Sequence, residues 1–322
     1  MERLELIVKD LQERGYCTQS MKQIKGGINS AVFQIKDSNS NKFLLKIYPL
    51  PTNNDPRNRC LAEQSFLRYV TLCNASKIPT FYGSDNYLGW TLMSWVDGVR
   101  PINLAQSDIN EITDFIEIIN CDSCINQRAR LQSASEAIKS PLALVESISD
   151  RLKKLKSITP STQICQDAIR WLNNEIEPHL NVIMSNFVNT KSNRSYWAEL
   201  DLQTIASPSD VGIHNILRTS KGLYFIDFEY AGLDDLSKFA ADWILQPEYK
   251  MSREKRHVFI ECLLEKLYPR VGDSWVYRLI DIEPLIHFKW CLIMLNKLYS
   301  GNLRREQLSK TINYHNNWTI NI

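Results

Sequence analysis

The sequence predicts an α+β fold, with strands in its first part and helices over most of the rest. Short segments of alternating apolar and polar residues lie between residues 30 and 95. From about residue 105 onward apolar residues recur at helical spacing, and only residues 207–229 interrupt that pattern. A length of 322 residues allows one large core or two smaller ones, so two lobes are compatible with the chain.

The composition is that of an ordinary globular protein, with 44% hydrophobic and 23% charged residues. A net charge of +2 without a long basic run argues against a nucleic-acid partner. Residues 1–16 lack the apolar centre of a secretion signal, and the apolar residues 284–295 are too few to span a membrane and include Lys289. We therefore expect a cytoplasmic protein without a membrane partner. Its oligomeric state is not indicated.

The eight cysteines are scattered along the chain, which favours reduced thiols over a disulfide framework. Cys121 and Cys124 form one Cys-x-x-Cys motif. A structural zinc site needs two further ligands, and neither a second pair nor a His-x-x-x-His motif follows nearby. We expect two thiols at a helix end.

A β-hairpin is predicted near the N-terminus. Residues 30–37 and 42–49 alternate with a period of two around the polar turn 38–41. Lys46 shares one face of the second strand with Leu44 and Tyr48. A helix is expected over residues 55–70 and a further strand over residues 89–95.

Glu63 lies on the apolar stripe of the helix expected at residues 55–70, together with Cys60, Leu67 and Val70. A carboxylate among apolar residues needs a partner, because its burial without one is unfavourable. Lys46 is the obvious candidate. The alternative, in which Glu63 lies at the helix edge, stays open.

Residues 207–229 carry two aspartates and an asparagine around a predicted hairpin. Two apolar runs flank a polar turn with Gly222, which predicts a hairpin from Asn215 to Asp227. Both residues are equidistant from Lys221, so we expect them to face each other at the open end, where Asp210 enters from a loop. Oxygen ligands of this kind suit Mg²⁺ when phosphates and water fill its other positions.

This segment resembles the aminoglycoside phosphotransferase and choline kinase branch of the protein-kinase-like fold. That branch carries His-Gly-Asp-x-x-x-x-Asn, then a hairpin and Asp-Phe-Glu. Asp210 and Asn215 keep the spacing, and residues 226–243 are similar to the segment that follows. Pro208 and Ser209 stand where the family usually has His and Gly. The Ser-Pro-Ser-Asp sequence at residues 207–210 also resembles bacterial members associated with surface polysaccharides.

The resemblance implies a bilobal fold, with a small β-rich N-lobe in residues 1–96 and a larger helical C-lobe in residues 97–322. It implies ATP and Mg²⁺ as cofactors. Asp210 would be the catalytic residue, and Asn215 and Asp227 would hold the metal.

The same resemblance assigns the nucleotide-binding residues. Lys46 would reach the phosphates, with Glu63 holding it in place. The hinge would offer the backbone of Ser94 to Val96 to adenine, although a core strand explains these residues as well. The phosphate loop would comprise four residues, although a Gly-Gly turn before a strand is common for other reasons: Gly26, Gly27, Asn29 and Ser30.

The function that follows is ATP-dependent phosphorylation of a hydroxyl group on a small molecule. A sugar or related metabolite is favoured, because the late helices lack the acidic cluster that a polycation requires. Residues 313–318 (Asn-Tyr-His-Asn-Asn-Trp) have the aromatic and amide side chains of many sugar pockets, or form an ordinary polar terminus. A nucleotide-binding pseudokinase and an aminoglycoside- or choline-type kinase are the alternatives.

Three further polar residues are given structural roles. His214 is expected to pack or to bond its own loop, and His287 is expected in the core of an apolar helix. Asp235 is expected to accept backbone N–H groups.

Overall fold

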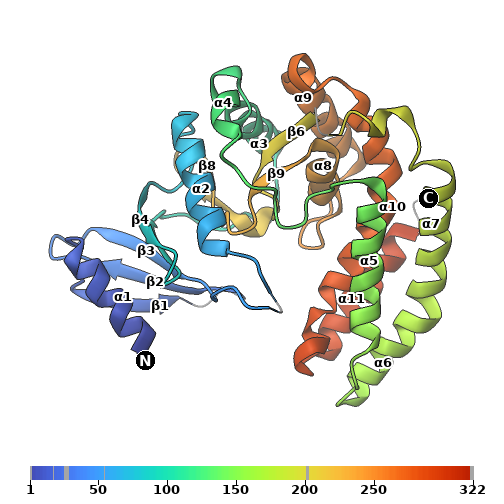
Figure 1. Ribbon diagram of the computed structural model, residues 1–322, viewed down its shortest axis with the longest axis horizontal. Helices are drawn as coiled ribbons and strands as arrows, with labels where there is room; N and C mark the ends of the chain where they lie inside the picture. The colour runs from blue at the N-terminus through green and yellow to red at the C-terminus, as the bar shows by residue number, and fades with distance from the viewer. Residues whose placement is uncertain (1, 17, 25–28, 54, 201–202, 320–322) are drawn as a thin grey trace. The chain divides into compact units, whose positions relative to one another are not determined.

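The structure is a computed structural model that describes residues 2–16, 18–24, 29–53, 55–200 and 203–319 (Figure 1). The chain divides into two compact units. The first comprises Met1–Ala137 and Ile205–Asp234, and the second Ile138–Thr204 and Asp235–Ile322. This division differs from the lobe boundary expected after residue 96, which stays a prediction.

The first unit contains a five-stranded antiparallel sheet in the order β1-β2-β3-β5-β4. The hairpin expected around residues 38–41 is present, with Ala31 opposite Ile47. Helix α1 (Glu2–Glu13) contributes Ile7 and Leu11 to a core that includes Trp90 of the sheet. The strands are β1 (Ser20–Ile24), β2 (Ala31–Lys36), β3 (Lys42–Ile47), β4 (Phe81–Asp85) and β5 (Trp90–Ser94).

Helix α2 spans Arg59–Leu72 and begins later than the sequence suggested. Asn58 is its N-cap, and the Asn58 side chain accepts a hydrogen bond from the amide of Leu61 at 2.9 Å. Asp55 instead pairs with the guanidinium of Arg57 at 2.6 Å. The expected start at residue 55 is therefore wrong, because Asn58 satisfies the first amides of the helix.

The hairpin of residues 216–225 is held by helix α3 (Gln106–Ile119). Phe115 of α3 stacks on Phe225 at 4.2 Å between ring centroids, and Glu111 accepts the amide of Leu223 at 2.9 Å. These contacts fix the second strand of the hairpin against α3. The remaining elements of this unit are η1 (Asp122–Cys124), α4 (Ile125–Arg128), β6 (Thr204–Ser207), η5 (Ile213–Asn215), β7 (Ile216–Thr219), β8 (Gly222–Phe225) and β9 (Gly232–Asp235). The first residue of β6 and the last residue of β9 are counted in the second unit.

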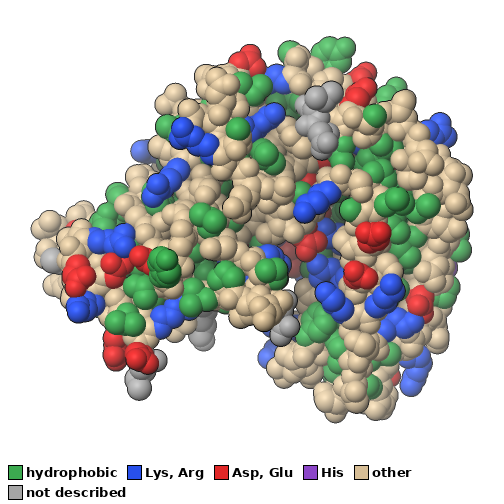
Figure 2. Space-filling model, in the orientation of Figure 1, with side chains coloured by type: hydrophobic (Ala, Val, Ile, Leu, Met, Phe, Trp, Pro, Cys, Tyr) green, Lys and Arg blue, Asp and Glu red, His purple; other side chains and the backbone are tan. Residues whose placement is uncertain are grey.

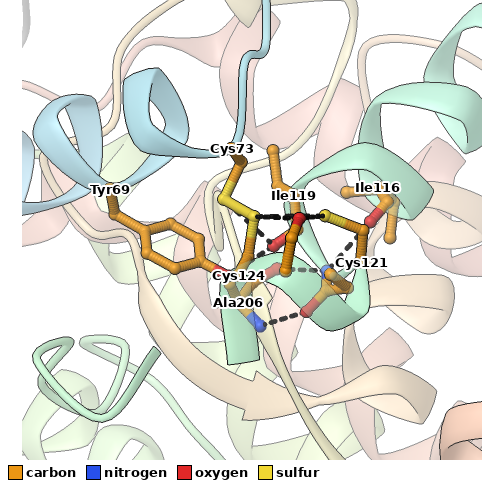
Figure 3. The surroundings of a disulfide bond; sticks show 9 residues. Tyr69, Cys73, Ile116, Ile119, Cys121, Cys124 and Ala206 are labelled. Carbon is orange, nitrogen blue, oxygen red and sulfur yellow. Dashed lines mark hydrogen bonds between the residues drawn. A yellow bond between two sulfur atoms is a disulfide. The ribbon is translucent and has the colours of Figure 1, made fainter. Parts of the chain in front are cut away.

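A disulfide joins Cys73, the C-cap of α2, to Cys124 of η1 (Figure 3). The Sγ atom of Cys121 lies 3.2 Å from that of Cys124. The expectation of reduced thiols is thus wrong for Cys73 and Cys124. The two bonded cysteines are 51 residues apart, so no local sequence pattern connects them. Cys60 is a buried free thiol of the same unit.

The second unit is helical, and α10 packs against α5, α7, α8 and α11. Asp235 caps α8 by accepting the amide of Ser237 at 2.6 Å, and it forms a fully buried ion pair with Arg278 of α10 at 2.7 Å. The structural role expected for Asp235 is confirmed. The elements are α5 (Pro141–Lys156), α6 (Gln163–Trp171), the π-helical η2 (Leu172–Ile176), α7 (Glu177–Thr190), η3 (Ser195–Trp197), α8 (Leu236–Leu245), α9 (Arg253–Val271), α10 (Ser274–Met294), η6 (Asn296–Ser300) and α11 (Arg305–Thr319).

The surface carries both signs of charge. Figure 2 shows acidic and basic side chains interspersed over the face that it draws. Among the helices of the described residues, none has the length and apolar character needed to cross a bilayer.

Candidate active site

Lys46 and Glu63 form a buried ion pair between strand β3 and helix α2. The Nζ atom of Lys46 lies 2.6 Å from Oε2 of Glu63, and the two residues are 4% and 0% exposed. The partner that the apolar stripe around Glu63 requires is therefore Lys46. The alternative, in which Glu63 lies at a solvated helix edge, is wrong.

Two further groups bind the carboxylate of Glu63. The hydroxyl of Tyr48 donates to Oε2, and the amide of Phe228 donates to Oε1 at 3.2 Å. Burial and the nearby charge of Glu63 raise the pKa of Tyr48 well above its usual value, so the phenol stays a donor. Both oxygens of Glu63 are thus engaged, which fixes the carboxylate that orients Lys46.

Asp227 and Glu229 complete the surroundings of Lys46. The Nζ atom lies 2.7 Å from Oδ1 of Asp227 and 3.5 Å from Oε2 of Glu229. Burial lowers the pKa of Lys46, but the charges of Asp227 and Glu63 outweigh it and hold the pKa well above the ordinary value. The carboxylates of Glu63, Asp227 and Glu229 each offer an oxygen, and these oxygens lie within 4.8 Å of one another. This density of negative charge suits cations.

Burial also acts on Glu229. It raises the pKa of that carboxyl group, Lys46 opposes the shift, and the negative charge of Asp227 adds to it. Sequence reasoning gave Glu229 no role, although its place two residues after Asp227 was visible.

The hairpin register differs by one residue from the expected one. Ile216 pairs with Phe225, and the carbonyl of Asn215 accepts the amide of Ile226 at 3.0 Å. Asn215 therefore lies opposite Ile226, and the expectation that it faces Asp227 across the ladder is wrong. The reason is a two-residue turn, whose centre falls between residues 220 and 221 because Thr219 pairs with Gly222.

Two residues that are not glycine have a left-handed backbone in this segment, Ser209 with φ 64° and Asp227 with φ 69°. Each such conformation costs about 1–2 kcal/mol, and strain of this kind concentrates at functional sites. Ser209 occupies the position where the family motif has Gly. The backbone thus adopts a conformation suited to glycine although the side chain has changed.

Asp210 lies in the loop before the hairpin. The Nδ2 atom of Asn215 donates a hydrogen bond to the main-chain oxygen of Asp210 at 2.8 Å. This bond holds the expected metal ligand next to the backbone of the expected catalytic residue. Nε2 of His214 lies 3.3 Å from Oδ1 of Asp210. The Asp210 side chain is 33% exposed and thus accessible to solvent. His214 thus bonds a residue of its own loop, as expected.

The remaining candidates are placed in part. Gly26 and Gly27 lie outside the described residues, and Ser30 directly precedes β2. Asn29 donates to the hydroxyl of Tyr230 at 2.7 Å, so this part of the loop reaches the chain just after Asp227.

At the expected hinge, the amide of Ser94 donates to the carbonyl of Thr80 at 2.8 Å. The amide of Trp95 donates to the carbonyl of Lys42 at 3.3 Å. Val96 lies two residues after the end of β5. Its pairing with adenine stays a prediction.

The model of the phosphotransferase enzyme family matches residues 20–238. This chain belongs to that family. The matched span holds every candidate residue described above, and the resemblance found in residues 207–243 is confirmed. No curated protein sequence matches this family member.

Solved structures share the fold of this phosphotransferase family member. They include a choline kinase from Cryptosporidium parvum, with a TM-score of 0.62 and 14% identity over 99% of this chain and 97% of that one. An ethanolamine kinase from Plasmodium vivax has a TM-score of 0.59 and 14% identity over 92% and 80%. An aminoglycoside phosphotransferase in an ADP-bound form has a TM-score of 0.56 and 14% identity over 97% of each chain. The α+β, protein-kinase-like fold class is thus confirmed.

Proposed function

We propose that this phosphotransferase uses ATP and Mg²⁺ to phosphorylate a hydroxyl group of a small molecule, a sugar or related metabolite. The observation that carries the proposal is Lys46, held at 2.6 Å by Glu63 and at 2.7 Å by Asp227. In kinases a strand lysine binds the nucleotide phosphates, a helix glutamate holds the lysine, and an aspartate binds the metal. Solved relatives in ADP-bound and ATP-bound forms support ATP as the donor.

Asn215 and Asp227 would offer oxygen atoms to a magnesium ion. Asn215 uses its Nδ2 atom on Asp210, which leaves the amide oxygen as its ligating atom, and Asp227 offers a carboxylate. When bound, Mg²⁺ neutralises the charge of the β- and γ-phosphates. Lys46 adds a second positive charge, and the fixed carboxylate of Glu63 keeps its ammonium group in place.

Asp210 would orient the acceptor hydroxyl and accept its proton during transfer. General-base assistance of this kind contributes on the order of 10²–10⁴-fold to the rate. His214, at 3.3 Å from the Asp210 carboxylate, would help to hold it.

A cavity in the second unit contains residues that the sequence suggested for a sugar pocket. Its volume is about 1180 Å³, and its lining includes Asn313, Tyr314, Asn317 and Trp318, the residues that suggested a sugar pocket. Lys250, Arg253, Arg256 and Lys310 also line it, against the carboxylates of Glu283 and Glu306. Aromatic and amide groups with an excess of cations favour a neutral or anionic sugar and disfavour a polycation. The link to surface polysaccharides stays a prediction.

The alternative is nucleotide binding without catalysis. It rests on Pro208 and Ser209, which replace the His and Gly of the family motif. Thermal shift with ATP and Mg²⁺ reports binding, and ADP release in the presence of sugars, amino alcohols and aminoglycosides reports transfer. Acceptor-dependent ADP release that disappears in Asp210→Asn would support the enzyme. Binding without release on any acceptor would support the pseudokinase, and the absence of binding would contradict both.

A further inference from the structure

Helices α10 and α11 bring two imidazoles and a thiol together in the core of the second unit. His287 and Cys291 are four residues apart on α10, so they lie on one face of that helix, and His315 comes from α11. Their exposed fractions are 0%, 0% and 4%. Each of the three offers a ligand atom, and these atoms all lie within 4.8 Å of one another.

Two of the three distances within this cluster match a tetrahedral zinc site. Zn–N bonds of about 2.0–2.1 Å and a Zn–S bond of about 2.3 Å place two nitrogens about 3.3–3.4 Å apart and a nitrogen and a sulfur about 3.5–3.6 Å apart. Nε2 of His287 lies 3.3 Å from Nδ1 of His315 and 3.7 Å from Sγ of Cys291. Both separations agree with those edges to within about 0.2 Å, the tolerance expected of a metal site.

A bound cation explains the close approach of these three ligand atoms better than hydrogen bonding does. An imidazole nitrogen carries either one proton or one lone pair, so Nε2 of His287 makes one good hydrogen bond. Two polar atoms nevertheless approach it. A divalent cation would be attracted by the two nitrogens and the sulfur at once.

The protonation states suit metal binding. Burial, with a smaller effect of His315, lowers the pKa of His287 to about 3, and burial lowers the pKa of His315. Neutral imidazoles can ligate without losing a proton. Burial raises the pKa of the Cys291 thiol, so a metal would have to displace that proton.

We propose that His287, Cys291 and His315 form a zinc-binding site, separate from the phosphotransfer residues of the first unit. Three protein ligands leave one tetrahedral position for water or a further group. His287 also lines the cavity of the second unit with Tyr314 and Trp318, which gives the metal a route to the site. Binding releases the thiol proton of Cys291 to solvent, and the resulting thiolate neutralises one of the two positive charges.

The test uses the full chain without an affinity tag, stripped by a chelator and titrated with Zn²⁺ and with Co²⁺. We expect one equivalent of either ion, and with Co²⁺ the absorption of a thiolate-to-cobalt charge transfer. Cys291→Ser should abolish that absorption. His315→Phe preserves an aromatic ring but removes the ligating nitrogen, and it should weaken Zn²⁺ binding by more than about 100-fold. Mutation of residues that only hydrogen-bond to metal ligands already lowers metal affinity 10–100-fold.

Cys165→Ser is the matched control, because Cys165 is an equally buried thiol of the second unit, and it should behave as wild type. Circular dichroism shows whether each variant folds. The Co²⁺ absorption spectrum of wild type still tests the site if a variant does not fold. A wild type that binds neither ion, or a charge-transfer absorption that survives Cys291→Ser, would overturn the site.

Discussion

Lys46 is a buried ammonium group surrounded by carboxylates of Glu63, Asp227 and Glu229. An isolated charge at this depth would be strongly unfavourable, and removing one partner of a buried pair leaves the other uncompensated. The excess of carboxylates over ammonium groups suits a site that admits a metal ion with its nucleotide.

Asp227 and Asp210 should respond differently to the loss of charge. Asp227→Asn removes a charge from the metal ligands, so Mg-ATP affinity and turnover should fall together. Asp210→Asn should leave the affinity nearly unchanged and lower the rate by at least ~10²-fold, as expected for a lost general base. Calorimetric ATP titration and ADP release measure the two quantities. Asp150→Asn, an exposed change on α5, is the control, and wild-type turnover in Asp210→Asn would rule out the mechanism.

Glu229 should make stability depend on pH. Its pKa is raised above 4.5 in the folded state, so the folded protein holds this proton more tightly than the unfolded chain. The resulting stabilisation is complete below pH 4.5 and is lost as the pH rises through the raised pKa. Relative to Glu229→Gln, the free energy of unfolding of wild type should therefore decrease with pH above 4.5. Urea denaturation across this range measures it, and a constant difference would contradict the assignment.

Sequence periodicity was sufficient to predict that Lys46 and Glu63 pair, because the alternation in the strand and the helical spacing around Glu63 are both local properties of the sequence. Tyr48 shared the strand face of Lys46, yet nothing local showed that its hydroxyl reaches Glu63. The positive φ of Asp227 was also invisible, since a left-handed aspartate depends on its tertiary surroundings.

Among the elements, the hairpin at residues 216–225 shows how far a turn can be predicted. Gly222 indicated the reversal, but the register depends on whether the loop has two or three residues. Strands β1 and β4 were missed because Ser20–Ile24 and Phe81–Asp85 are short and largely polar or irregular. Their place in the sheet is determined by pairing with β2 and β5.

The disulfide between α2 and η1 should contribute to stability by restricting the unfolded chain. For a loop of 51 residues, Cys73→Ser should lower the free energy of unfolding by about 2–4 kcal/mol under oxidising conditions. Dithiothreitol should remove the difference. Chemical denaturation measures both conditions, with Cys262→Ser, a change at a cysteine outside the disulfide, as control. If the reductant leaves wild-type stability unchanged, this contribution is absent.

The ion pair between the α8 cap and α10 should be far more important than a surface pair. Arg278→Met removes the cation that pairs with the fully buried Asp235 and should destabilise the protein by about 3–5 kcal/mol. Lys9→Met removes the exposed partner of Glu13 and should change stability by less than about 1 kcal/mol. Equal effects of the two changes in urea denaturation would contradict this ranking.

For the whole molecule, the charge of the late helices predicts acceptor preference. Aminoglycosides bring several ammonium groups, and the late helices lack the acidic cluster that such a polycation requires. Their kcat/KM should lie at least about tenfold below that of the best sugar, or about 1.4 kcal/mol. Steady-state ADP release at saturating ATP measures the ratio. Efficient turnover of kanamycin-like polyamines would contradict the expectation.

The sequence distance between Lys46 and Asp227 sets an order of events during synthesis. The two residues are 181 positions apart, and ribosomes add about 5–20 residues per second. Strand β3 and helix α2 therefore emerge about 10–35 s before the carboxylate that completes their site. During that interval Lys46 has only Glu63 as a partner among these carboxylates. Until residues 205–234 are synthesised, water solvates this ion pair, so its burial is completed only late in synthesis.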